Sequence, residues 1–258
     1  MRAILNHVTV ILVIFLVTAA VGCKKNSSPT ETPPTISGDL FPIVEGHLYV
    51  YNEYETNAQG TKISGTDYRV ATKVGSSVTI AGKTGNILVD SIYTTNGQFF
   101  KLDTLITARK GTDGTIYFTL PQNMFQDFPV SLALPLIWLP FFQPSAGVGT
   151  GYDIYSLDTT VTYQYSPDLS IPVRIQLTLS GVINQKENVN VPAGSYSAYR
   201  GELNYSLTAT SGTITLSSQN GNILTMWLYE NVGPVKIAWT PMGSATTGTA
   251  RELVSKNF

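Results

Sequence analysis

Apolar and polar residues alternate along three clear stretches of the chain: residues 47–54 (HLYVYNEY), 159–165 (TTVTYQY) and 174–180 (RIQLTLS). Successive side chains of a β-strand point to opposite faces, so each stretch would bury one face and expose the other. Almost no stretch has the apolar spacing of an amphipathic helix. The pattern therefore predicts antiparallel β-strands through most of the chain.

Turn signals separate the strand-like stretches. Asn96-Gly97, Asp113-Gly114 and Asn220-Gly221 are predicted to be tight hairpin turns, because both central residues of a type I′ turn need positive φ. About a dozen candidate strands result, at the spacing of an all-β sandwich or barrel. The predicted fold class is all-β: an antiparallel sheet that forms a barrel, a half-barrel or a sandwich. In one alternative arrangement, the two halves of the chain on either side of residue 145 each form a separate sheet.

The first residues have the layout of a signal peptide: Arg2 precedes a mostly apolar run, residues 8–21, and small residues precede Cys23. This run is shorter than the roughly 20 residues of helix that cross a bilayer, so cleavage is favoured. Ala20-Val21-Gly22-Cys23 resembles the lipobox of bacterial lipoproteins, with Ala20 where leucine is usual. The resemblance implies a diacylglyceryl group on the Cys23 thiol and a mature N-terminus at Cys23. The alternatives are a retained anchor helix and an ordinary signal peptide.

Cysteine usage favours lipidation, because Cys23 is the single cysteine and cannot form an internal disulfide. Residues 24–34 contain prolines and no apolar periodicity, which predicts a flexible tether. The predicted organisation is a lipoprotein signal peptide at residues 1–22, a lipidated tether at 23–40 and a single β domain at 41–258. No aspartate follows Cys23, which favours attachment to the outer membrane, with the domain facing the periplasm.

The segment at residues 128–142 (FPVSLALPLIWLPFF) is apolar but is interrupted by Pro129, Pro135 and Pro140. Prolines at this density exclude a regular spanning helix or a central strand. One interpretation is a crossover that is buried in the core or caps one end of a barrel. In the other, a cavity for a lipid-like ligand, or a contact with the membrane, is formed by Trp138, Leu139, Phe141 and Phe142.

Motifs for cofactor binding are incomplete. Gly82-Lys83-Thr84 lacks the first glycine of a phosphate-binding loop, because Ser77 stands at that position. Residues 147–151 (GVGTG) precede an extended stretch, whereas a dinucleotide site needs a helix there. We predict a hairpin turn at the first motif and a flexible loop at the second, and no cofactor.

The sequence contains few residues that could catalyse a reaction or bind a metal ion. A Ser-His-Asp site would have to use His47, which is predicted to face solvent from an alternating strand. Histidines and cysteines are too few for a zinc site. No run has the spacing of a calcium-binding loop, although calcium binding by the loops around Asp113 or Asp153 stays an alternative. No metal is therefore predicted.

The charged residues leave a carboxylate site as an alternative and exclude nucleic acid as a partner. Glu53 and Glu55 share a strand face and are expected to be exposed, although they could meet another acid across a cleft, as in glycosidases. The 16 Lys and Arg against 17 Asp and Glu, without a large basic cluster, exclude nucleic acid as a partner.

Two stretches resemble a group of uncharacterised exported β-sheet domains, the domain of unknown function 3108-like proteins. Residues 191–200 (VPAGSYSAYR) match a "VPAG-aromatic" turn, and residues 226–236 (MWLYENVGPVK) match a "W-x-x-x-x-x-G-x-V-K" segment. Residues 41–51 (FPIVEGHLYVY) are similar to the opening of the same proteins, with Leu48 where tryptophan is common. The resemblance implies a lipid-anchored antiparallel β domain without assigned catalysis, curved like the half-barrels of periplasmic lipoprotein carriers. It carries over no catalytic residue, and we assign Trp227 and Trp239 to the core.

Three functional hypotheses follow. The leading one is a non-enzymatic binding or structural module, anchored to the membrane through lipidated Cys23, with an apolar ligand or another envelope protein as its partner. The second is a carrier of lipid or another apolar ligand. The third is a hydrolase that uses carboxylates on glycans, which needs two acids about 5–10 Å apart in a cleft.

Overall fold

The computed structural model describes residues 36–119, 136–166, 168–240 and 246–258. All described residues belong to one compact unit. The predicted signal peptide and Cys23 lie outside the described residues. No helix among the described residues is long and apolar enough to cross a membrane.

Twelve β-strands and a short 3-10 helix make up the described part of the chain. The first six strands are β1 (Leu48–Asn57), β2 (Tyr68–Ile80), β3 (Lys83–Thr94), β4 (Phe99–Lys110), β5 (Ile116–Thr119) and β6 (Trp138–Phe142). After the 3-10 helix η2 (Pro144–Ala146) come β7 (Gly151–Ser166), β8 (Leu169–Val191), β9 (Gly194–Ser211), β10 (Ile214–Tyr229), β11 (Gly233–Trp239) and β12 (Thr247–Lys256).

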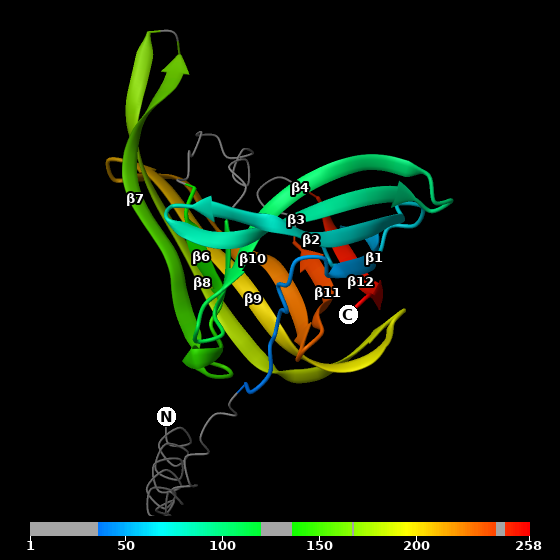
Figure 1. Cartoon of the computed structure of the whole chain (residues 1–258). Coiled ribbons are helices and arrows are strands. Elements are labelled where there is room, and N and C mark those ends of the chain that lie inside the picture. Colours follow the sequence, from blue (N-terminus) through cyan, green and yellow to red (C-terminus); the bar gives the residue numbers. More distant parts are fainter. Residues whose placement is uncertain (1–35, 120–135, 167, 241–245) are drawn as a thin grey trace, which may run out of the picture. The chain divides into compact units, whose positions relative to one another are not determined.

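All twelve strands belong to one antiparallel sheet, in the order β6-β5-β4-β3-β2-β1-β12-β11-β10-β9-β8-β7. Strands that follow each other in sequence therefore pair, except β6 and β7, which are the two edges of the sheet, and β1 pairs with β12. The sheet curls strongly on itself, with long strands β7 to β10 on one side and the shorter β1 to β4 on the other (Figure 1). The alternative in which each half of the chain forms its own sheet is therefore wrong.

Contacts of β6 with β7 and β9 bring the two edges of the sheet together. The Tyr152 hydroxyl, on β7, donates a hydrogen bond to the Phe141 carbonyl oxygen of β6 over 2.7 Å. The Phe142 ring lies so close to Gly201 of β9 that a Cβ atom there would be 2.3 Å from it. The predicted all-β fold class is confirmed, as a nearly closed barrel. Pro140 lies within β6, at a sheet edge, where a residue without an N–H is tolerated.

Alternation sets an inner and an outer face. In β8, every second residue from Val173 to Leu179 is buried, as the pattern of residues 174–180 predicts. In β12, Arg251 and Leu253 point inward and are buried, and Glu252 between them points outward. The inner face carries most of the apolar core, which also takes in Leu40 and Phe41 from the segment before β1.

Three of the four predicted hairpin turns are confirmed in position, but the type I′ geometry predicted at Asn96-Gly97 and Asp113-Gly114 is wrong, because neither Asn96 nor Asp113 has positive φ. Ile80 pairs with Lys83 across Ala81-Gly82, and Gly97 and Gly114 have positive φ in the turns after β3 and β4. The turn at Asn220-Gly221 is wrong, because these residues pair with Ser206 and Tyr205 inside β10. The chain reverses earlier, at Gly212, whose φ is +57°. An Asn-Gly pair favours a turn only locally, and here the pairing with the 18-residue strand β9 overrides it.

Candidate functional site

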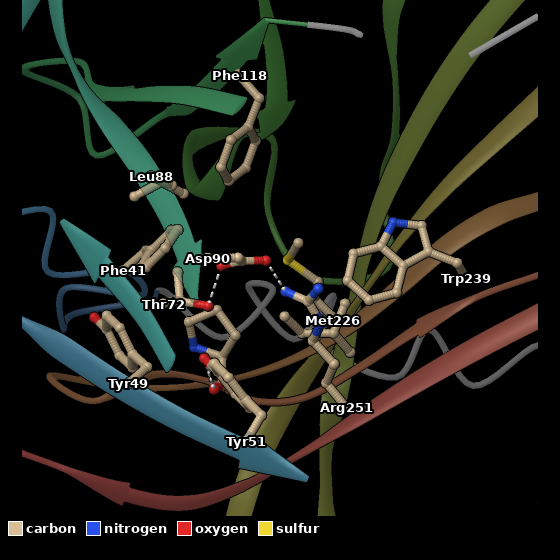
Figure 2. Close-up of a pocket in the computed structure, with 12 residues that line it drawn as sticks. Phe41, Tyr49, Tyr51, Thr72, Leu88, Asp90, Phe118, Met226, Trp239 and Arg251 are labelled. Atoms are coloured by element: carbon tan, nitrogen blue, oxygen red, sulfur yellow. Dashed lines mark hydrogen bonds and ion pairs between the residues drawn. The ribbon is translucent and has the colours of Figure 1, made fainter. Parts of the chain in front are cut away.

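A charged cluster lies on the inner face of the barrel, around Arg251 of β12 (Figure 2). Its Nη1 donates to Asp90 Oδ2 over 2.6 Å, and its Nε donates to Glu53 Oε2 over 2.5 Å. The other Asp90 oxygen accepts a hydrogen bond from the Thr72 hydroxyl over 2.6 Å. The side chains of Arg251 and Asp90 are only 8% and 2% exposed. One buried guanidinium thus holds two carboxylates from strands β1 and β3.

Neighbouring charges favour the protonated form of Arg251. Burial alone would lower the pKa of Arg251, but the charges of Asp90 and Glu53 outweigh it, so the pKa of Arg251 is raised. The guanidinium also lies over the Trp239 ring, 5.1 Å from its centroid. Both acids are therefore committed to an ion pair, which is an arrangement suited to holding strands rather than to general acid–base chemistry.

The cavity beside this cluster is small, with a volume of about 40 Å³. Aromatic and aliphatic side chains, among them Phe118, Met226 and Trp239, form most of its wall. Burial raises the pKa of Tyr51, whose hydroxyl donates to the Pro234 carbonyl oxygen over 3.0 Å. The space suits about three water molecules, which need about 10–15 Å³ each by this measure, and excludes an acyl chain or a sugar.

A larger pocket of about 340 Å³, the outer pocket, lies on the opposite face of β1, β11 and β12. Its floor is formed by Ala238 and Ala250, which are register partners, and Ala250 also pairs with Tyr54. The small floor residues leave a hollow between larger aromatic walls, which are Tyr54, Trp227 and Trp239. The turn after β1, residues 57–60, completes the lining. Trp239 also lines the inner cavity, so it lies between the two spaces.

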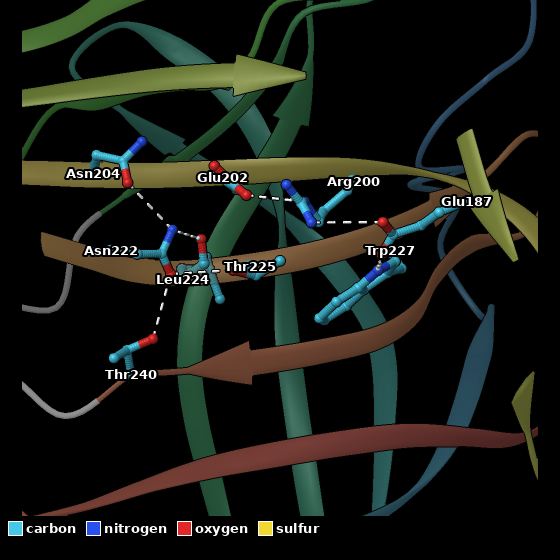
Figure 3. Close-up of polar contacts among 9 residues, drawn as sticks. All are labelled: Glu187, Arg200, Glu202, Asn204, Asn222, Leu224, Thr225, Trp227 and Thr240. Carbon is cyan, nitrogen blue, oxygen red and sulfur yellow. Dashed lines mark hydrogen bonds and ion pairs between the residues drawn. The ribbon is translucent and has the colours of Figure 1, made fainter. Parts of the chain in front are cut away.

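Polar groups of the outer pocket are oriented by neighbours. Lys236 donates from Nζ to Glu252 Oε1 over 2.9 Å, and the Tyr54 hydroxyl donates to the same oxygen over 2.9 Å. Trp227 donates from its indole nitrogen to Glu187, and Thr240 donates to Asn222 Oδ1 over 3.3 Å (Figure 3). The ammonium of Lys236 is therefore balanced by Glu252, and the pocket offers aromatic faces, amides and hydroxyls without an uncompensated charge.

No family model matches the chain, and no curated protein matches it. Among solved structures, it is similar to a candidate lipoprotein from Parabacteroides distasonis ATCC 8503, with 14% identity over 86% of this chain and 100% of that one and a TM-score of 0.47. A candidate exported protein with a YmcC-like fold from Bacteroides fragilis has 13% identity, the same two coverages and a TM-score of 0.39. The hypothetical lipoprotein YmcC from Escherichia coli has 11% identity, coverages of 80% and 84%, and a TM-score of 0.29. These values are too low to transfer a function.

The four apolar residues predicted to bind a ligand are all in β6. Leu139, Phe141 and Phe142 are buried in the core, and the Phe118 ring packs against both phenylalanines, with centroids 5.3 and 6.4 Å away. Trp138 is half-buried and donates from its indole nitrogen to the Ile80 carbonyl oxygen over 2.8 Å. None of the four lines the inner cavity or the outer pocket. Their role in ligand binding stays a prediction.

The other residues considered from the sequence are dispersed. Glu53, expected to be exposed, is instead half-buried against Arg251, because the pairing of β1 with β12 places them opposite each other. Glu55 is exposed, as expected. His47 is half-buried rather than solvent-facing, because its ring stacks on Phe258 with centroids 3.9 Å apart. Among the described residues, no group of three or more His, Cys, Asp or Glu could hold a metal ion.

The sequence patterns do not predict the outer pocket, although two of its residues lie in a motif that they identify. Trp227 and Lys236 belong to the motif at residues 226–236. Trp227, which the sequence assigns to the core, is partly buried and packs against the core. Trp227 and Lys236 are register partners on adjacent strands, with the Lys236 ammonium 5.6 Å from the Trp227 ring centroid. The useful signal was the alternation in β11, which places Lys236 and Ala238 on the face opposite Val235 and Ile237.

Proposed function

We propose that this chain is a non-enzymatic binding module of the bacterial cell envelope, anchored by a lipidated Cys23, with its ligand site in the outer pocket. The observation that carries the binding role is the pocket itself. At about 340 Å³ it falls within the size of small-molecule sites, roughly 300–1,000 Å³. Aromatic walls and a few oriented polar groups are the usual lining of such sites.

The anchor rests on the sequence: a short apolar run, small residues before Cys23 and a proline-containing tether after it. Two or three acyl chains hold a protein to a bilayer far more firmly than one, because each buried methylene contributes about 0.8 kcal/mol. The lack of aspartate after Cys23 supports the outer membrane, with the barrel facing the periplasm.

The ligand chemistry follows from the lining. Lys236 is neutralised by Glu252, so a charged ligand would meet no uncompensated partner. Flat aromatic faces beside amides and hydroxyls favour an uncharged polar ligand with at least one apolar face, and a sugar ring has this character. The small inner cavity gives the alternative of a lipid carrier no support, and the ion pairing of Asp90 and Glu53 gives none to a carboxylate-based hydrolase.

Native mass spectrometry of the lipoprotein purified from its own envelope tests the binding role. We expect an additional bound mass in the wild type that is lost in Ala238→Phe, which fills the pocket floor. Ser218→Phe adds the same ring at an exposed position of β10 and should keep the bound mass. A bound mass that survives Ala238→Phe, or none in the wild type, would contradict the proposal.

Mass spectrometry of the N-terminal peptide tests the anchor separately. Acylated Cys23 in the membrane fraction, and an uncleaved or released chain for Cys23→Ser, are the expected results. A mature chain with a free Cys23 thiol would refute the proposed lipid anchor and would leave the proposed ligand site unaffected.

A further inference from the structure

The turn between β3 and β4 carries the most exposed aromatic residues of the described chain. Phe99 and Phe100 are 60% and 57% exposed, and Leu102 is 62% exposed. The hairpin runs out to its turn at the right of Figure 1, on the side opposite the β9–β10 turn, and the yellow β8–β9 turn lies below it on the same side. Large apolar side chains gathered at one tip, rather than scattered over the surface, indicate an interaction site.

Apolar groups cover both faces of this hairpin. Phe99 pairs with Tyr93 in the register, and their ring centroids are 5.8 Å apart. Phe100 contacts Tyr68 instead, also at 5.8 Å. Tyr93 pairs with Arg69, the residue after Tyr68, so Tyr93 and Tyr68 lie on opposite faces. A protein partner would cover one face of such a hairpin, whereas a medium that surrounds the tip covers both.

The tip is also free of charge. Residues 91–100 (SIYTTNGQFF) contain no Asp, Glu, Lys or Arg. The first charged residue after them is Lys101, whose Nζ contacts Asp103 Oδ2 at 3.2 Å at the base of the tip. Aromatic side chains favour the boundary between water and lipid, and an uncharged tip can enter that boundary without desolvating an ion. At the turn between β9 and β10, the exposed large apolar side chains are both aliphatic: Ile214 and Leu216.

We propose that the β3–β4 tip, residues 93–100, inserts into the surface of the bilayer that holds the lipid anchor; this rests on the proposed acylation of Cys23. Residues 24–35 separate Cys23 from the first described residue. A chain of this length spans at most about 45 Å when fully extended. The barrel thus stays close enough for a second membrane contact, which restrains its orientation.

Bromolipid quenching of the full lipidated chain tests the proposal. Wild type, Phe99→Trp, Ser195→Trp and Ile214→Trp are each reconstituted into phosphatidylcholine–phosphatidylglycerol vesicles with or without dibrominated phosphatidylcholine. Ser195 is exposed at the start of β9 and serves as the matched control. We expect the emission added by the new tryptophan in Phe99→Trp to be quenched at least threefold more than that added in Ser195→Trp, with the wild type supplying the background of the three native tryptophans.

Flotation of the same vesicles separates the two proposals. A chain that floats with the vesicles but shows equal quenching for Phe99→Trp and Ser195→Trp would overturn the membrane contact and leave the anchor intact. Stronger quenching in Ile214→Trp than in Phe99→Trp would assign the contact to the other tip and would also overturn it. A chain that does not float would refute both the anchor and the contact.

Discussion

Arg251 and Asp90 are 161 residues apart in the chain and form an ion pair across the inside of the barrel, with 2.6 Å between Nη1 and Oδ2. Their strands, β12 and β3, are not neighbours, because β1 and β2 lie between them in the sheet. The pair therefore fixes the curvature of the sheet rather than a single strand register. Glu53 joins from β1 and Thr72 from β2, so all four strands contribute to one cluster.

Loss of the guanidinium should destabilise the barrel strongly. Arg251→Leu leaves buried Asp90 and half-buried Glu53 without a counter-charge, and breaking a buried pair in this way costs about 3–5 kcal/mol. We expect a decrease of this size in the free energy of unfolding, measured by urea denaturation. Arg174→Leu removes an exposed ion pair with Asp158 and should change the same quantity far less, because water screens exposed charges. Similar losses in the two variants would contradict this account.

Closure of the sheet depends on the absence of a side chain at residue 201. A Cβ atom at Gly201 would lie 2.3 Å from the Phe142 ring, so Gly201→Ala must displace the β6 edge. Such overpacking costs about 1–3 kcal/mol in unfolding free energy. Gly221→Ala on neighbouring β10, where the nearest atom would be 3.5 Å away, should be close to neutral. Thermal and urea unfolding of both variants measures the difference.

A double mutant identifies the cause. If the clash with Phe142 is responsible, Phe142→Leu should relieve part of the cost of Gly201→Ala, with a coupling of about 0.5–3 kcal/mol. Strictly additive effects would mean that Gly201 matters for its backbone alone.

The turn between β2 and β3 offers a stabilising substitution. Ala81 has φ +47° and Gly82 has φ +72°, so the two central residues adopt a left-handed backbone. Asparagine tolerates this region better than alanine, and Asn-Gly is the preferred pair for such turns. Ala81→Asn should therefore raise the unfolding free energy by about 0.5–1 kcal/mol. A lower midpoint of urea unfolding for this variant would contradict the turn geometry.

Local patterns predicted much of the fold, because alternation depends only on adjacent residues. The stretch at residues 174–180 indicated a strand with one buried face, and Val173, Ile175, Leu177 and Leu179 are buried. Asn220-Gly221 misled for the same reason, since a local turn preference says nothing about the distant strand that pairs with it. Order in the sheet, with β1 against β12, depends on contacts between residues about 200 positions apart.

The candidate site was harder to predict, since both of its spaces depend on that long-range pairing. Arg251 and Glu53 become neighbours only through the β1–β12 register. Without that register, the sequence gives no reason to bury either charged side chain, so both would be expected at the surface. Likewise, Ala238 and Ala250 form a pocket floor only because Tyr54 and Trp227 flank them on adjacent strands. Cys23 is the opposite case, because its predicted modification depends on a contiguous motif.

Buried tyrosines should make the barrel sensitive to alkali. Burial raises the pKa of Tyr49, Tyr51 and Tyr152 above the ordinary value near 10. Below about pH 10 the tyrosines are protonated in both states. Above it, the unfolded chain loses these protons first, so the free energy of unfolding falls as pH rises, by up to about 1.4 kcal/mol per pH unit for each tyrosine.

Tyr152→Phe isolates one of these groups. At pH 7 the variant loses the 2.7 Å hydrogen bond to the Phe141 carbonyl oxygen and should be less stable by about 0.5–1.5 kcal/mol. Between pH 10 and 12 the wild type also loses the contribution of the Tyr152 proton, which the variant never had, so the gap between them should narrow and then reverse. Urea unfolding at pH 7, 10 and 11.5 measures it. Parallel stability curves would show that Tyr152 has the same pKa in the folded and unfolded states, which would contradict the raised pKa of this half-buried side chain.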